Sequence, residues 1–210
     1  NNFYNAPIIR VSVFLNDEDI QVINKFIKRS NFDGEAYYPS KAIEETEIEN
    51  IFSSFFSEAR FVVFNQGKEN NKESIVDTLI DKLSDSKSDD FKEKLHNQLL
   101  LREEFGSVAF SNDVAFPHPA EAIGLESEIV VGIVPDGCQW DSEHGNIKFV
   151  FLMSLARVGN KGINKINKTF TKFIANQEVQ ARILENPTFS TFKKSFLSLQ
   201  TENALKQELY

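Results

Sequence analysis

One histidine in this sequence is held between two prolines. His118 stands between Pro117 and Pro119, directly after the apolar residues 114–116, which we expect to form a short buried strand. Proline fixes its own φ angle and has no N–H to give to a sheet, so the strand should end at Pro117. An imidazole is nucleophilic and exchanges protons near pH 7. His118 is therefore a candidate nucleophile that accepts and passes on a chemical group, although a structural histidine in a loop has the same local pattern.

A second motif precedes this histidine, at the end of a helix that we expect over residues 89–105. It reads Leu100-Leu101-Arg102-Glu103, and the strand motif reads Ala115-Phe116-Pro117-His118. Together the two motifs resemble the enzyme IIA domain of the phosphotransferase system, of the mannitol/fructose type, over residues 58–205. The resemblance implies that His118 carries a phosphoryl group as phosphohistidine.

A phosphohistidine site needs one ring nitrogen free to attack phosphorus and the other bonded to a fixed acceptor, so that the correct tautomer is held. It also needs donors for the phosphoryl oxygens, because phosphoryl transfer depends mainly on positioning and electrostatics. Arg102 is the best candidate, since its guanidinium fork matches phosphate oxygens. Ser107 and the backbone N–H groups near Ser111 could add donors. A structural role for Arg102, as a helix C-terminal cation paired with Glu103 or Glu104, stays open.

The sequence departs from transport-type members of this family at three positions. Val108 stands where those members carry a threonine, and Gly162 stands where they carry a second histidine. Pro119 replaces a common glycine and resembles instead the IIA-like domains of transcriptional regulators of sugar operons, the antiterminator-like activators with phosphotransferase regulation domains (PRDs). We therefore interpret the chain as a regulatory IIA-like module from the C-terminal end of such a regulator. Water, Asn160 or Lys161 would fill the place of the missing imidazole.

The resemblance also implies partners. The phosphocarrier protein HPr, an enzyme IIB, or both would load or unload His118, docking on exposed apolar side chains such as Phe110 or Phe116. The chain starts at Asn1 without a methionine, so we expect it to be cut from a longer protein, with the DNA- or RNA-binding domains and PRDs before it. Two alternatives remain. One is a transport enzyme IIA that relays phosphate to a sugar permease, and the other is a docking module in which His118 no longer reacts.

The apolar spacing predicts an α/β domain with a mixed sheet sandwiched between helices. Residues 1–57 form a first segment, with a strand over 8–14 and helices over 17–27 and 42–56. Its motif Pro7-Ile8-Ile9-Arg10-Val11-Ser12 is similar to the tail of an enzyme IIB-like domain, and a structural N-terminal extension is the alternative. Residues 58–210 form the IIA-like domain. Its strands are expected over 61–64, 114–116, 129–134 and 147–155, with a turn at 135–137 closing the third. Its helices are expected over 75–83, 89–105, 163–174, 177–184 and 189–199.

Composition narrows the function classes. The net charge is −8 and no basic stripe is present, so we expect no direct nucleic-acid binding by these residues. No apolar run approaches the roughly 20 residues of a membrane helix, so no membrane insertion is expected. Cys138 is the only cysteine, which excludes an internal disulfide and indicates a reducing cytoplasm. Cys138 and His144 are too few for a zinc site, and no metal or organic cofactor is implied. The sequence leaves a homodimer open.

Overall fold

The fold is taken from a computed structural model of the protein, in which residues 41–64, 70–85, 87–157 and 162–207 are described. The chain divides into two units, Asn1–Glu44 and Glu45–Tyr210, and the sheet lies in the second. The strand expected over 8–14 and the helix expected over 17–27 lie outside the described residues, as do Asn160 and Lys161.

Four strands form a mixed sheet in the described part of the chain: β1 (Phe61–Val63), β2 (Val114–Ala115), β3 (Glu128–Cys138) and β4 (Ile147–Ser154). Their order across the sheet is β1-β3-β4-β2. The long strands β3 and β4 pair antiparallel, while β1 pairs parallel with β3 and β2 pairs parallel with β4. The prediction of a mixed sheet is confirmed.

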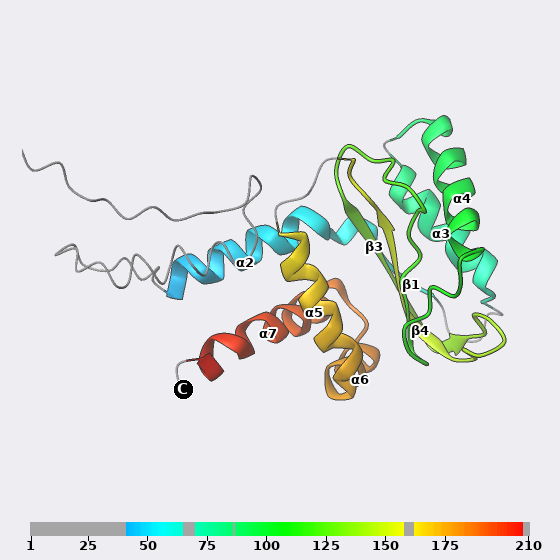
Figure 1. The fold of residues 1–210 in the computed structure, drawn as a ribbon. Helices are drawn as coiled ribbons and strands as arrows, with labels where there is room; N and C mark the ends of the chain where they lie inside the picture. Colours follow the sequence, from blue (N-terminus) through cyan, green and yellow to red (C-terminus); the bar gives the residue numbers. More distant parts are fainter. Residues whose placement is uncertain (1–40, 65–69, 86, 158–161, 208–210) are drawn as a thin grey trace, which may run out of the picture. The chain divides into compact units, whose positions relative to one another are not determined.

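Helices cover both faces of this sheet (Figure 1). Because side chains alternate along a strand, Val131 and Ile133 of β3 face one layer while Val130 and Val134 face the other. The first layer contains α2 (Lys41–Phe55), α5 (Ile163–Ala175), α6 (Gln177–Glu185) and α7 (Phe189–Gln207), and its core is rich in phenylalanine. The second layer contains α3 (Lys72–Ser84) and α4 (Asp89–Glu103), with leucine and isoleucine at its core. The expected α/β sandwich is therefore present.

The helices predicted within the described residues are confirmed, but the end of one strand was predicted wrongly. Pro135-Asp136-Gly137 was expected to close the third strand, whereas β3 continues to Cys138. The register against β4 shifts between Ile133 and Cys138, so these residues form an irregularity within the strand. Gly137 has a φ of +72°, which glycine adopts without the steric cost of a side chain.

Candidate functional site

The loop that carries His118 is fixed between the sheet and α4. Strand β2 lies parallel to β4, and the chain leaves it through Pro117, whose carbonyl accepts the N–H of Met153 at 2.8 Å. Two residues after His118, the N–H of Ala120 donates to the carbonyl of Gln98 in α4 at 3.1 Å. The loop is thus tied on both sides of the histidine, and His118 itself is half-buried.

Two contacts set the chemical state of the His118 ring. Nδ1 lies 2.7 Å from the carbonyl oxygen of Phe116, and because a carbonyl only accepts, Nδ1 carries the hydrogen. Nε2 lies 2.9 Å from Nε of Arg102, which donates to it. The lone pair of the neutral ring is therefore on Nε2, and a guanidinium stands beside it. This is the tautomer that a nucleophilic Nε2 requires.

Helix α4 places Arg102 in this position. The helix is capped by Ser88, whose side chain accepts the N–H of Phe91 at 3.3 Å, and acidic residues occupy its first turn. Arg102 lies in the last turn, and its Nη1 donates to the carbonyl of Gly106 at 3.2 Å. Glu103 pairs with Lys72 of α3 at 2.6 Å rather than with Arg102. The arginine is therefore directed to the histidine and to the turn that follows the helix.

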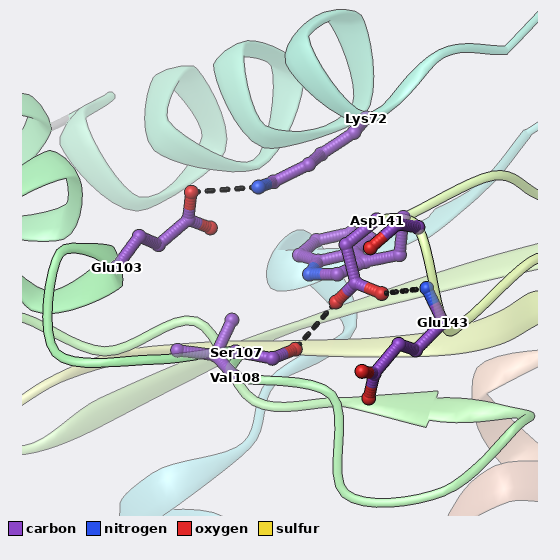
Figure 2. Close-up of a pocket in the computed structure, with 8 residues that line it drawn as sticks. Lys72, Glu103, Ser107, Val108, Asp141 and Glu143 are labelled. Atoms are coloured by element: carbon purple, nitrogen blue, oxygen red, sulfur yellow. Dashed lines mark hydrogen bonds and ion pairs between the residues drawn. The ribbon is translucent and has the colours of Figure 1, made fainter.

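Ser107 is hydrogen-bonded to Asp141, an aspartate that no sequence motif marks. Its hydroxyl donates to Oδ2 of Asp141 at 2.6 Å, and its oxygen accepts the N–H of Ala109 at 3.0 Å. Both residues line a pocket that Lys72 and Glu103 also border (Figure 2). A direct contact from Ser107 to a phosphoryl group stays a prediction, because its hydroxyl hydrogen is already given to Asp141.

Asp141 is the centre of a dense set of hydrogen bonds. Its carboxylate accepts the backbone N–H of Glu143 at 2.9 Å, and the backbone N–H and ring Nδ1 of His144, each at 2.8 Å. Partial burial by itself raises the pKa of Asp141, but the bonds from Ser107, Glu143 and His144 outweigh it and hold this pKa well below its usual range. Asp141 therefore stays ionised at neutral pH.

An apolar cavity of about 390 Å³ lies beside His118, bordered by Phe110, Met153 and Ile174 among others. Phe110 is 60% exposed, as expected for a docking residue. The expectation for Phe116 is wrong, because this ring is only 6% exposed. It stacks on Phe151 of β4 with a centroid separation of 5.3 Å, since residues 114 and 116 point to the aromatic face of the sheet.

Gly162 is the N-cap of α5, and its backbone conformation excludes most side chains. Its φ is +97°, and a Cβ built on it would lie 2.9 Å from Cγ2 of Ile51 in α2. A histidine at this position would be strained in its backbone and would collide with α2. The packing of α2 against α5 therefore leaves no room for a side chain at position 162.

Other site classes find no support in the described residues. No group of three or more His, Cys, Asp or Glu there could hold a metal ion. Burial raises the pKa of the Cys138 thiol to about 11, so it is not a reactive thiolate at neutral pH. None of the helices in the described ranges has the length and apolar character to cross a membrane.

The comparison with protein families decides the identity of the domain. The model of the family described as "Phosphoenolpyruvate-dependent sugar phosphotransferase system, EIIA 2" matches residues 55–198. The chain belongs to this family. No curated protein matches the chain.

Solved structures share the EIIA fold at low sequence identity. The crystal structure of IIA mannitol from Escherichia coli has a TM-score of 0.53 at 16% identity, covering 68% of this chain and 99% of that one. The nitrogen regulatory protein IIA-Ntr from Neisseria meningitidis has a TM-score of 0.52 at 13% identity, covering 70% and 99%. The complex of enzyme IIA mannitol with phosphorylated enzyme IIB mannitol from E. coli gives 0.52 at 14% identity, covering 68% and 97%. These likenesses show the fold alone.

Proposed function

We propose that Nε2 of His118 accepts a phosphoryl group in the sugar phosphotransferase system. The observation that carries this proposal is the pair of contacts on the ring, from Nδ1 to the Phe116 carbonyl and from Arg102 to Nε2. They leave the lone pair on Nε2 and put a fixed cation beside it. Such a cation would stabilise the negative charge of the group in transfer.

In the proposed step, the lone pair of Nε2 attacks the phosphorus of phosphorylated HPr. The Nε2–P bond forms while the bond between phosphorus and HPr breaks, and that electron pair returns to HPr. The hydrogen on Nδ1 stays in its bond to Phe116. Arg102 exchanges its bond to Nε2 for bonds to the phosphoryl oxygens, which its planar fork fits.

We further propose that the domain regulates rather than transports. The fold occurs both in IIA mannitol and in a nitrogen regulatory protein, so the fold does not decide between the two roles. The support comes from Gly162, which stands where transport-type members carry a second histidine, and from Pro119. Without that imidazole, we expect a phosphohistidine that is passed on slowly and that reports sugar flux to the DNA- or RNA-binding domains and PRDs of a longer regulator.

The proposal includes domain limits and partners. Residues 1–57 would be the tail of an enzyme IIB-like domain and residues 58–210 the IIA domain, acting in the cytoplasm. HPr, an enzyme IIB, or both would dock over Phe110 and the cavity beside His118. The mannitol IIA structure in complex with its phosphorylated IIB is a precedent for the second partner.

The test measures radiolabelled phosphoryl transfer from phosphorylated HPr to the 210-residue chain. We expect the wild type to be labelled and His118→Ala to remain unlabelled. The matched control is His96→Ala, which changes an exposed histidine of α4 and should leave labelling unchanged. An unlabelled wild type would support the alternative of a docking module and refute the proposal.

A second measurement separates regulation from transport. The labelled chain is mixed with an enzyme IIB, and loss of label is timed against loading from HPr. The regulatory role predicts onward transfer that is slower by about tenfold or more, a barrier difference of about 1.4 kcal/mol. Onward transfer as fast as loading would favour a transport enzyme IIA. Restoring histidine at position 162 is a poor test, because of the φ of +97° and the contact with Ile51.

A further inference from the structure

We infer that Asp141 is a positioning residue for the phosphoryl site, acting through Ser107 and the Gly106 carbonyl on the guanidinium of Arg102. The inference rests on the proposed role of His118. Asp141 lies 34 residues from Ser107 in the sequence, in the connection between β3 and β4, and it makes no contact with the reacting nitrogen in this arrangement of bonds.

The orientation of Arg102 depends on two bonds. Nε donates to Nε2 of His118 at 2.9 Å, and Nη1 donates to the carbonyl of Gly106 at 3.2 Å. Because a guanidinium is planar, two bonds at different nitrogens fix both its direction and its plane. A displaced Gly106 carbonyl would rotate the fork away from the position where the phosphoryl oxygens arrive.

The backbone of Gly106 makes one hydrogen bond as a donor, from its N–H to the carbonyl of Glu103 at 3.0 Å, and its side has no packing contact. It is exposed, its φ is +126°, and no atom lies within 4 Å of the place where its Cβ would stand. The next residue adds an anchor on the other side of the Gly106 carbonyl, because the hydroxyl of Ser107 donates to Asp141 at 2.6 Å and accepts the N–H of Ala109 at 3.0 Å. Figure 2 shows Ser107 and Asp141 directed toward each other across the pocket.

Asp141 is itself a rigid support. Its carboxylate accepts three bonds from its own turn, two from backbone N–H groups and one from the ring of His144. The turn is closed by a 2.8 Å bond from the N–H of Trp140 to the carbonyl of His144. Trp140 is only 4% exposed and anchors the turn in the core. The path from this anchored turn to Arg102 therefore runs through the 2.6 Å bond between Asp141 and Ser107, the backbone of residues 106–107 and the 3.2 Å bond from Arg102 to Gly106.

The test combines substitutions at the proposed positioning residues with one at Arg102. Asp141→Asn and Ser107→Ala are each made alone and together with Arg102→Gln, and phosphoryl transfer from HPr is timed. Each single substitution should slow transfer about fivefold, because a shift well below 1 Å costs less than the roughly 100-fold loss expected for 1 Å. In the background of Arg102→Gln, each of these substitutions should slow transfer by less than about a further twofold, because the effects of residues that act as a unit are not additive. Ser107→Thr keeps the hydroxyl and should retain the wild-type rate.

A spectroscopic measurement reports the position of Arg102 without any transfer. The Nε–H of Arg102 should give a slowly exchanging NMR signal in the wild type, which exchanges faster in Asp141→Asn and Ser107→Ala. The control is Glu128→Gln, which also neutralises a carboxylate. The side chain of Glu128 is 17% exposed, similar to the 27% of Asp141, but it pairs with Arg60 and Lys87 and lies outside this hydrogen-bond network. Glu128→Gln should change neither the transfer rate nor the Arg102 signal.

Each outcome bears on the inference. Equal slowing with and without Arg102→Gln would overturn it and would point to a direct contact of Ser107 with phosphate. An unchanged Arg102 signal in Ser107→Ala would also overturn it. Should Asp141→Asn fail to fold, Ser107→Ala decides, since Ser107 is exposed and loses only its hydroxyl. If the wild type is never labelled, the proposed function fails, while the NMR signal still tests the positioning.

Discussion

Replacing Arg102 by glutamine tests the central contact of the proposed site. Arg102 is half-buried, donates to His118 at 2.9 Å and is not paired with Glu103. Glutamine keeps a polar side chain but loses the positive charge and the fork. We expect the unfolding midpoint to change little, because the substitution removes neither core packing nor a helix cap.

The magnitude follows from two opposing terms. Loss of a fixed donor from the transition state of group transfer costs about 2.7–4 kcal/mol. In the resting site, Arg102 donates a hydrogen bond to Nε2 of His118, and the wild type must break this bond before Nε2 can attack. Breaking a bond from a charged donor costs about 1.5 kcal/mol, and Arg102→Gln does not have this cost. The net increase in the barrier is about 1.2–2.5 kcal/mol, so transfer should slow about 8- to 70-fold. Arg102→Lys keeps the charge without the fork and should fall between the variant and the wild type.

The assay is the initial rate of labelling by phosphorylated HPr, with the unfolding midpoint of each variant measured in parallel. A rate for Arg102→Gln within twofold of the wild type, in a folded protein, would refute the role of the guanidinium. A rate below detection would show that the resting bond to Nε2 offsets little of the stabilisation that Arg102 gives to the transition state.

Four further predictions follow from other residues. Phe116→Ala should lower the free energy of unfolding by about 3–5 kcal/mol in urea titrations, because a buried ring stacked on Phe151 is lost. Phe110→Ser should weaken HPr binding in calorimetry while leaving the free energy of unfolding within about 0.5 kcal/mol, since this ring is 60% exposed. The folded-state pKa of Asp141 lies below the ordinary value, so ionised Asp141 stabilises the folded protein fully above about pH 4, and this stabilisation is lost as the pH falls toward the folded-state pKa. In thermal unfolding, Asp141→Asn should therefore lose less stability than the wild type when the pH is lowered through this range. With a pKa of about 11, buried Cys138 should react with a thiol reagent at pH 7 only after unfolding, which absorbance kinetics would reveal.

The sequence alone predicted the helix layers of the domain and the pair of residues at the proposed site. The spacing of Ile75, Leu79 and Leu83 and of Phe192 and Phe196 marks helix faces, and these residues are buried. Apolar periodicity is local information, because one helix turn or one pleat repeats within a few residues. Arg102 and His118 were also selected from the sequence, as motifs at a helix end and a strand end, and the structure brings them into contact.

Only the tertiary structure decided which residues support that pair. Asp141 joins Ser107 across 34 residues, through a sheet connection whose path no local pattern specifies. The sequence did hold one signal, because an aspartate often accepts the backbone N–H groups of the next two or three residues and so forms a side-chain turn. Such turns are common, however, and they do not indicate which distant residue the aspartate will contact.

The exposure of Phe116 was predicted wrongly for a related reason. Its burial depends on Phe151 of β4 and Phe170 of α5, which come from distant parts of the chain. These rings meet Phe116 only when β2 pairs with β4 and residue 116 follows the register of Val114. The local sequence also could not predict that β3 continues through Pro135 and Gly137. The long antiparallel pairing with β4 overrides the turn preference of those residues.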